Sequence, residues 1–408
     1  RGRGLSESVR GRIREFDATA LLGFGMRRSL FSNCGGGGTS DVKVPEDLLH
    51  ELLRSEVAHL ASVQVKPVSM GEALGCHDPE KTADLILKEV PKRLAFRIHR
   101  IEVLSGWRAV PELVQLHGML HTWYRLLRLV RRDEGLSEFT KCVERIRLGG
   151  RNTVRIAAMG MHKLHRTGPY EDHILDEWLD DYLLSRIGSN ILIDQYRAIT
   201  RKEHGGRGRK NGIIDPVCNA IAVCREASDD VTELCLEYLG KAPPCVIEHY
   251  IAGKSGPQPD TPCTISYIPG YLRYIMRELL KNSFHATVRT SVDGADLRAR
   301  PIHVLVCSGE RHVAIRVSDR AGGIPFEIGD RIWSYLYGAA AREAGDNSDD
   351  ANSPQATELA GFGVGLQLSR LHARYLGGRL ELTTYPGYGT DAYVFLPRID
   401  ARSVEGIP

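Results

Sequence analysis

The chain of 408 residues is 42% hydrophobic and 26% charged, which is typical of a globular protein large enough for two domains. Its 54 basic and 51 acidic side chains leave a net charge of +3 at pH 7, so we expect no nucleic-acid partner. No run approaches the roughly 18 apolar residues of a membrane-spanning helix, and we expect no span. The nine cysteines include no Cys-x-x-Cys pair and fit neither a disulfide framework nor a cysteine zinc site, which favours reduced thiols in an intracellular compartment.

Residues 1–40 differ from the rest of the chain. They contain seven arginines and three acidic residues, and they end in the glycine-rich "GGGGTS". An arginine-rich, serine-containing and acid-poor segment is typical of a mitochondrial targeting sequence. We predict targeting to the mitochondrial matrix, with a disordered tail as the alternative interpretation.

Residues 41–212 are predicted to form an all-α domain. Apolar residues recur every three or four positions through most of residues 80–200, for example in "LVQLHGMLHTWYRLLRLV". Glycine and proline separate these segments, which favours several helices packed as a bundle. The basic, glycine-rich segment "TRKEHGGRGRKNG" at 200–212 has no apolar period, so we place the domain boundary there.

Residues 213–400 have a different pattern. A helix is predicted over about 215–239, followed by the strand-like segments "CTISYI", "PIHVLVC", "HVAIRVSD", "GRLELTTY" and "DAYVFLP". Further helices are predicted among these strands at 271–290 and 364–376. We expect one sheet with helices on one face, followed by a tail at 401–408.

The predicted helix at 271–290 carries two polar groups that its apolar stripe does not require. Glu278 and Asn282 lie four residues apart and therefore share one face, with His285 near it one turn later. An amide oxygen is a suitable ligand for a hard cation such as magnesium, and a carboxylate can act as a base or orient a water. Such a pair alone is more often a solvated helix face.

Three further motifs strengthen the functional interpretation. In "VSDRAGGIP" a strand ends at Asp319 before a glycine-containing turn. In "GFGVGLQLSRLHARYLGG" the residues Gly361, Gly363 and Gly365 open a helix, where backbone N–H groups and the helix dipole favour phosphate. In "PGYGTDAYVFLP" the turn before the last strand contains Thr390.

These motifs, in this order, resemble the nucleotide pocket of the GHKL superfamily, which includes gyrase, ninety-kilodalton chaperones, histidine kinases and mismatch-repair ATPases. More closely, "RELLKN", "GFGVGLQLSRLHARYLGG" and "WLDDYLLSRIGSNILIDQY" resemble the mitochondrial protein kinases that phosphorylate 2-oxoacid dehydrogenase complexes. The resemblance covers most of residues 80–400. It implies a two-domain fold: an N-terminal four-helix bundle with a regulatory role, and a C-terminal α/β sandwich of the Bergerat type that binds ATP.

The resemblance also implies roles for individual residues. Glu278 would be the catalytic base or a water-orienting carboxylate, and Asn282 the magnesium ligand. Asp319 would accept the adenine amino group beside Gly323, and Thr390 would support the adenine through a water. The other residues implied at the nucleotide are His285 and the phosphate-wrapping Gly361, Phe362, Gly363, Val364, Gly365 and Leu366.

The resemblance further implies the ligands and partners of the protein. ATP and ADP would bind with Mg²⁺, and the sequence leaves open whether K⁺ accompanies it. Residues 333–360, which include the polar "DNSDDANSPQ", would form an ATP lid. The substrate would be a serine of the decarboxylase subunit, and phosphorylation would inactivate the complex. The kinase would form a homodimer, bind the lipoyl-bearing acyltransferase core and respond to a 2-oxoacid.

Three positions depart from the family pattern. The middle glycine of the turn after Asp319 is Ala321, which a negative φ would tolerate. An arginine of the family is replaced by His285, and a hydroxyl-bearing string in the lid reads Gly-Ala-Ala at 338–340. These departures bear on how tightly nucleotide binds and on catalytic competence.

Two features favour the branched-chain branch of this family over the pyruvate branch. Tyr274 occupies the place of a histidine that the pyruvate kinases have four residues before the catalytic glutamate. The last strand is followed by "LPRIDARSVEGIP", without the Asp-Trp pair of their tail. We predict a branched-chain 2-oxoacid dehydrogenase kinase, with a pyruvate dehydrogenase kinase as the alternative.

Other classes of protein fit the sequence less well. A histidine kinase is suggested only by "HKLHRTGP" at 162–169, which carries an extra residue and precedes a Gly-Pro break. A chaperone-like or scaffold ATPase would need a coupling domain after the last pocket strand. A pseudokinase of the same fold stays open because of Ala321, His285 and Ala339.

Overall fold

The fold was analysed in a computed structural model, which describes residues 45–65, 71, 78–130, 135–201, 212–337 and 363–398. The predicted targeting segment, most of the predicted lid, Gly361, Phe362 and the tail at 401–408 lie outside these residues.

The first half of the chain is helical. Its long helices begin at residues suited to helix starts: Asp78 caps α4 by accepting a hydrogen bond from the backbone N–H of Glu80 (3.0 Å), and prolines occupy the first position of α4 and α5. The helices are α2 (Glu46–Ala61), α4 (Pro79–Glu102), α5 (Pro111–Leu129), α6 (Ser137–Gly149), α7 (Thr153–Thr167) and α8 (Asp172–Thr200).

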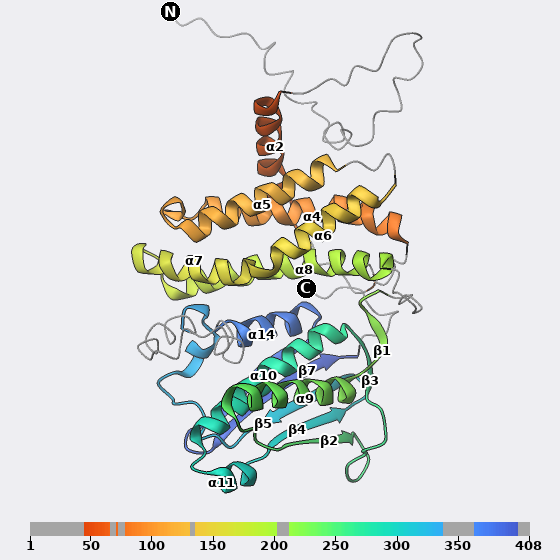
Figure 1. The fold of residues 1–408 in the computed structure, drawn as a ribbon, viewed down its shortest axis with the longest axis vertical. Helices are drawn as coiled ribbons and strands as arrows, with labels where there is room; N and C mark the ends of the chain where they lie inside the picture. The colour runs from red at the N-terminus through yellow and green to blue at the C-terminus, as the bar shows by residue number, and fades with distance from the viewer. Residues whose placement is uncertain are drawn as a thin grey trace, which may run out of the picture.

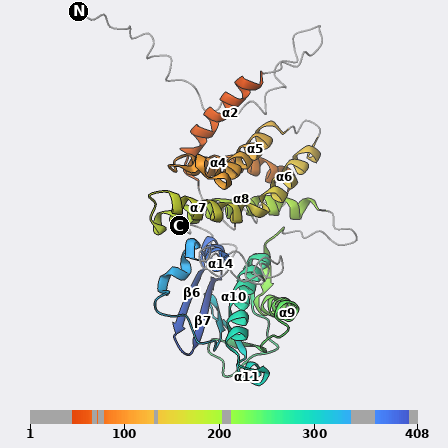
Figure 2. The ribbon, with the colours of Figure 1, turned by 60° about the vertical axis from the view of Figure 1, so that its left-hand side comes forward.

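Four of these helices form a closed bundle. Helix α4 packs against α5 and α8, and α7 closes the ring between α5 and α8. Side chains such as Ile86, Leu116, Met161 and Leu183 are almost completely buried in its centre. Helix α6 lies against α5 and α8, while α2 contacts α4 and projects away from the bundle (Figures 1 and 2). The predicted N-terminal helical bundle is therefore confirmed.

The second half is an α/β domain built on a five-stranded mixed sheet. The strand order is β2-β4-β5-β7-β6; β2 and β4 run parallel and the other neighbours antiparallel. The strands are β2 (Cys245–Ile251), β4 (Ile302–Ser308), β5 (His312–Ser318), β6 (Arg379–Tyr385) and β7 (Gly389–Pro397). A separate antiparallel pair consists of β1 (Asp215–Asn219) and β3 (Thr264–Tyr267).

Helices cover one face of the large sheet, as predicted. Helix α9 (Ala220–Leu239) packs on β2 and β4, α10 (Pro269–Thr290) on β5, and α14 (Gly365–Tyr375) on β6 and β7 (Figure 1). The short α11 (Gly294–Ala299) follows α10. The helix predicted from residue 215 begins only at Ala220, because residues 215–219 pair with β3 and Asn219 caps the helix through the N–H of Ile221.

The two halves are joined by direct contacts. The backbone N–H of Tyr335 donates to Asp176 of α8 (3.0 Å), and its buried hydroxyl donates to Asp180 (2.7 Å). Burial raises the pKa of both carboxyls above the usual range for aspartate. Helix α14 also packs on α8. The segment that enters the predicted lid is thus anchored to the helical domain.

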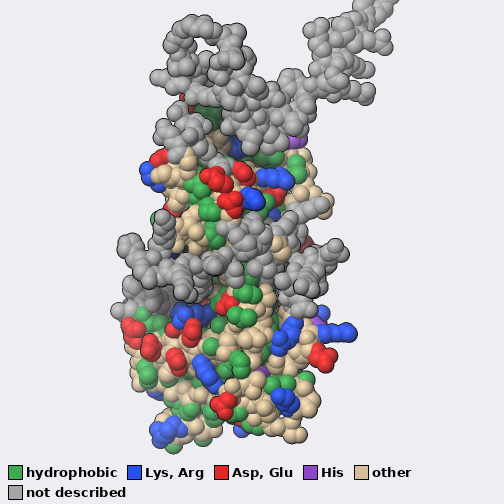
Figure 3. Space-filling view, turned by 90° about the vertical axis from the view of Figure 1, so that its right-hand side faces the viewer, with side chains coloured by type: hydrophobic (Ala, Val, Ile, Leu, Met, Phe, Trp, Pro, Cys, Tyr) green, Lys and Arg blue, Asp and Glu red, His purple; other side chains and the backbone are tan. Residues whose placement is uncertain are grey.

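The outer surface carries charge of both signs. On the face shown in Figure 3, Lys and Arg side chains alternate with Asp and Glu side chains over both halves. Within the described residues, no helix combines the length and the apolarity that crossing a membrane requires.

Candidate nucleotide site

The site is centred on Asp319, which follows β5 at the end of the strand. Its carboxylate is only 6% exposed and accepts hydrogen bonds from the hydroxyl of Ser283 (2.9 Å) and from the backbone N–H groups of Ala321 (3.1 Å) and Thr390 (3.3 Å). Burial raises the pKa of this carboxyl above its usual value, and the three donors oppose that shift. The carboxylate is therefore held in one orientation.

The turn after Asp319 brings two backbone segments into close contact. Gly323 has a φ of +74°, and a Cβ there would overlap the carbonyl group of Tyr385, so this position requires glycine. Ala321, in the place of the family glycine, is buried. Among the described residues only glycines have positive φ, so the alanine is accommodated without backbone strain.

Thr390 lies beside Asp319 because β5 and β7 are neighbours in the sheet. The N–H of Asp319 donates to the carbonyl of Thr390 (3.0 Å), and the Thr390 hydroxyl lies 3.3 Å from that of Thr384 on β6. The Thr384 hydroxyl in turn accepts the N–H of Ile324 (2.7 Å). This network fixes the wall of the site opposite α10.

A cavity of about 190 Å³ lies between α10, the β5 turn and β7. Its walls are mostly apolar with a few polar groups, which is typical of a site for a small ligand. The polar groups come from residues of the predicted motifs or from residues adjacent to them in the sequence. The lining residues are Leu279, Asn282, Ser283, Ala286, Val317, Asp319, Ala321, Gly323, Ile324, Ile332, Leu366, Leu382, Thr390 and Ala392.

Helix α14 begins at the other end of the cavity. Among the described residues no side chain caps its N-terminus, and its N-cap residue, Val364, is buried. Leu366 lines the cavity, so the first turn of the helix faces the site. The positive end of the helix dipole and the N–H groups of the first turn, which have no partner within the helix, favour an anion. Gly363, with a φ of +71°, precedes this turn.

Glu278 lies against the start of α14. A Cβ at Gly365 would overlap its carboxylate and come within 2.9 Å of its Cδ, so only glycine leaves room for this side chain. The carboxylate forms an ion pair with Lys281 (2.8 Å), and both side chains are mostly buried. Asn282, one turn further along α10, is exposed and lines the cavity.

The structure thus brings Glu278, Asn282, Gly365, Leu366, Asp319, Gly323 and Thr390 into one site. His285 lies on α10 outside the cavity lining, and burial lowers its pKa, with the charge of Arg289 adding to this effect. The lowered pKa favours the neutral imidazole, so His285 supplies less positive charge than an arginine would. The roles that the resemblance implies for all these residues stay predictions.

Four supporting residues were not identified from the sequence. Ser283 donates to Asp319, Thr384 fixes the turn, and Lys281 pairs with Glu278. Gln367 donates to the carbonyls of Ile332 (3.0 Å) and Ser334 (2.9 Å) and ties α14 to the lid entry. Lys281 and Ser283 flank Asn282 in the sequence, but only the fold shows where their side chains lie.

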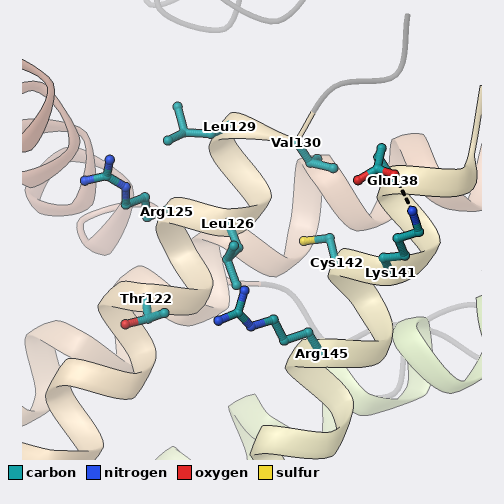
Figure 4. A pocket seen from close by; sticks show the side chains of 9 residues that line it. All are labelled: Thr122, Arg125, Leu126, Leu129, Val130, Glu138, Lys141, Cys142 and Arg145. Atoms are coloured by element: carbon teal, nitrogen blue, oxygen red, sulfur yellow. Dashed lines mark hydrogen bonds and ion pairs between the residues drawn. The ribbon is translucent and has the colours of Figure 1, made fainter. Parts of the chain in front are cut away.

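A second, larger cavity of about 570 Å³ lies in the helical domain between α5 and α6. Figure 4 shows Leu126, Leu129 and Val130 on one side and Cys142 on the other, with Arg145 reaching toward α5. Its mouth carries the Glu138–Lys141 ion pair (2.6 Å). This cavity is separate from the residues around Asp319.

Comparison with known proteins decides the family. Residues 68–215 match the family model described as mitochondrial branched-chain alpha-ketoacid dehydrogenase kinase. Residues 268–400 match that of histidine kinase-, DNA gyrase B- and HSP90-like ATPases. The chain is also 33% identical over 373 residues to the human mitochondrial pyruvate dehydrogenase (acetyl-transferring) kinase isozyme 4, covering 88% of this chain and 87% of that relative. The chain belongs to the mitochondrial 2-oxoacid dehydrogenase kinase family.

The similarity extends to other members of the family. The rat pyruvate dehydrogenase (acetyl-transferring) kinase isozyme 1 is 30% identical over 404 residues, which are 93% of this chain and 87% of that relative. Its human counterpart is 28% identical over 427 residues, covering 99% of this chain and 92% of that relative. This 2-oxoacid dehydrogenase kinase homologue is an ATP-dependent protein kinase whose C-terminal half is the GHKL nucleotide-binding domain.

Proposed function

We propose that this kinase phosphorylates a serine of the decarboxylase subunit of the branched-chain 2-oxoacid dehydrogenase in the mitochondrial matrix, and thereby inactivates the complex. The observation that carries the choice of complex is the match of residues 68–215, most of the helical domain, to the branched-chain kinase model. Tyr274 supports it, because the resemblance implies a histidine at this position in the pyruvate kinases. The Tyr274 ring packs against His372, with the ring centroids 5.2 Å apart. A mitochondrial location is supported by the mitochondrial relatives and by the composition of residues 1–40.

The pyruvate dehydrogenase complex is the second candidate substrate. Its support is the name of the relatives that match almost the whole chain at 28–33% identity. The helical-domain match carries the branched-chain name and the full-length relatives carry the pyruvate name, so the two comparisons support different complexes.

The geometry of the site fits magnesium and ATP. Asn282 offers an exposed amide oxygen at the cavity, one turn from the Glu278 carboxylate, and oxygen atoms are the ligands that Mg²⁺ prefers. The buried Asp319 carboxylate is an acceptor for the adenine amino group, with Gly323 and Thr390 at its sides. The open start of α14 would hold the phosphates together with residues 361–366. Magnesium, when bound, neutralises charge on the phosphates.

Phosphoryl transfer depends mainly on position and electrostatics, so few catalytic side chains are needed. Glu278 accepts the proton of the substrate serine hydroxyl while the serine oxygen forms a bond to the γ-phosphorus of ATP. The bond between the γ-phosphorus and the oxygen that bridges it to the β-phosphate breaks, and ADP leaves. Lys281 holds the Glu278 carboxylate in place through their 2.8 Å ion pair. The N–H groups of the first turn of α14 stabilise charge on the phosphate oxygens.

The remaining partners follow from membership of the family. We expect binding to the lipoyl-bearing acyltransferase core through the helical domain, homodimerisation, and regulation by a 2-oxoacid. Co-sedimentation of the kinase with each purified core and analytical ultracentrifugation of the kinase alone measure the first two of these.

The proposal is tested by following labelled phosphate from ATP into purified branched-chain and pyruvate decarboxylase components. We expect transfer to the branched-chain component, lost in Glu278→Gln and Asn282→Ala. Transfer to the pyruvate component alone would select the second candidate. Labelling of neither component, with ATP binding retained, would contradict the kinase assignment of this site and favour the pseudokinase.

A further inference from the structure

A group of three metal-binding side chains lies far from the nucleotide site, at the corner where α4 leads into α5. Glu102 is the last residue of α4, and His117 and His121 are four residues apart on α5, so the two imidazoles share one face of that helix. One ligand atom from each residue lies within 4.8 Å of the other two.

Both imidazoles approach the same carboxylate oxygen. The Nε2 atom of His117 lies 2.9 Å from Oε1 of Glu102, and that of His121 lies 3.8 Å from it. Around tetrahedral zinc, with bonds of about 2.0–2.1 Å, neighbouring ligand atoms are about 3.3 Å apart. The two distances bracket this value, so small rotations of the side chains would place all three ligands around one ion.

The surroundings support a site with one open position. The His117 ring packs against Trp107 (centroids 4.6 Å apart), which restricts its orientation. Glu102 is 41% exposed, whereas His117 and His121 are 20% and 27% exposed, so an ion could enter from the Glu102 side and keep a water there. A simple ion pair explains why His117 lies close to Glu102. It does not explain why the imidazole of His121 also approaches the same carboxylate oxygen.

The geometry points to a divalent transition-metal site, of the zinc type, formed by Glu102, His117 and His121. Two imidazoles and one carboxylate suit Zn²⁺ and Co²⁺ and disfavour Mg²⁺ and Ca²⁺, which prefer sites made only of oxygen atoms. The ion would connect the end of α4 to the middle of α5 and so stabilise the loop at 103–110. This site is independent of the nucleotide site and of the dehydrogenase that serves as substrate.

The test measures binding of Zn²⁺ to the full chain by calorimetry, with Mg²⁺ and ADP present to occupy the nucleotide site. We expect one Zn²⁺ per chain and a rise in Tm on binding. Removal of a side chain that hydrogen-bonds to a metal ligand typically weakens metal binding by about 10- to 100-fold. Removal of a ligand itself should weaken Zn²⁺ binding at least as much. His121→Gln and Glu102→Gln should therefore bind Zn²⁺ at least tenfold more weakly and lose the Zn²⁺-dependent rise in Tm.

A matched control is His165→Gln. His165 forms an ion pair with a single carboxylate, Asp172 (2.7 Å), and is in no three-residue group among the described residues. The His165→Gln variant should bind Zn²⁺ with the same affinity as the unmodified protein. Circular dichroism and the Tm without metal show whether each variant folds.

The Co²⁺ complex identifies the ligand type. Its absorption spectrum should be that of nitrogen and oxygen ligands without a thiolate charge-transfer band. The described cysteines are free, and burial raises the pKa of Cys142, Cys218 and Cys235 to about 11, which disfavours their thiolates. A thiolate band, equal Zn²⁺ affinity of His121→Gln and the unmodified protein, or no Zn²⁺ binding at all would each overturn the assignment.

Discussion

At one end of the nucleotide cavity Asp319 is 6% exposed and its carboxylate accepts three hydrogen bonds. At the other end Asn282 is exposed, and no side chain among the described residues caps the start of α14. The Asp319 end is rigid and already complete. The Glu278 end offers open polar groups to a charged ligand. This difference implies a division of labour, in which the Asp319 end determines whether nucleotide binds and the Glu278 end determines whether its phosphate is transferred.

The largest expected effect comes from Glu278→Gln, which tests the Glu278 end. General-base catalysis contributes about 10²- to 10⁴-fold in rate, so transfer to the decarboxylase component should fall by about this factor. The affinity for ATP should change little, because the amide keeps the size and position of the side chain. Labelled-phosphate transfer and calorimetry with ATP measure the two quantities.

The control for that variant is Glu226→Gln, since Glu226 also pairs with a side chain of α10, Arg273 (3.3 Å), but lies away from the cavity lining. It should transfer phosphate at the normal rate. Equal losses in both variants would mean that the effect comes from the stability of α10 rather than from catalysis.

Gly365→Ala perturbs the same end through its packing. The added methyl group would overlap the Glu278 carboxylate and force that side chain to move. A displacement of about 1 Å at a catalytic group can reduce the rate by roughly 100-fold, so we expect a loss of this order in transfer. A transfer rate within threefold of normal would show that the contact between Glu278 and α14 is not required.

At the other end, Asp319→Asn should weaken ATP binding by roughly 10- to 100-fold, the value of a hydrogen bond to a charged group. The pH dependence has a definite sign. Ionised Asp319 is the better acceptor, and burial raises its pKa, so the affinity for ATP should fall as the pH is lowered through this raised value. The fall should begin at a higher pH than for an ordinary aspartate with a pKa of 3.8.

Calorimetric titrations with ATP at several pH values measure this dependence. In Asp319→Asn the corresponding part of the pH dependence should disappear. An unchanged pH profile in that variant would show that another group controls binding.

The smallest effect is expected for Ala321→Gly, which restores the glycine of the family pattern. Because Ala321 does not have a positive φ, glycine there should lower stability by about 0.5–1 kcal/mol through its greater freedom in the unfolded chain. The affinity for ATP should stay within threefold of normal. Gly323→Ala, by contrast, places a methyl group against the Tyr385 carbonyl and should be far more damaging in both thermal unfolding and ATP binding.

Much of this architecture could be predicted from the sequence because it depends on local patterns. The helical periodicity of residues 80–200 and the alternation in segments such as "HVAIRVSD" predicted the two kinds of domain, and the glycine motifs pointed to the turns of the pocket. The start of α9 was placed five residues too early, since pairing of β1 with β3 depends on a partner almost 50 residues away.

Interactions between distant segments could not be predicted in this way. The hydrogen bonds of Tyr335 to Asp176 and Asp180 join residues more than 150 positions apart, and the overlap between Gly365 and Glu278 depends on how α14 packs on α10. The polar residues Lys281, Ser283 and Thr384 are common in any sequence, and only their positions in the fold give them a role.

The most direct test of the division of labour is single-turnover phosphate transfer at saturating Mg·ATP, comparing Asp319→Asn with Glu278→Gln. If the Asp319 end serves binding and the Glu278 end serves transfer, Asp319→Asn should regain nearly the full rate at saturation, while Glu278→Gln should stay about 10²-fold or more below it. A rate that stays equally low in Asp319→Asn, or that recovers in Glu278→Gln, would contradict the account.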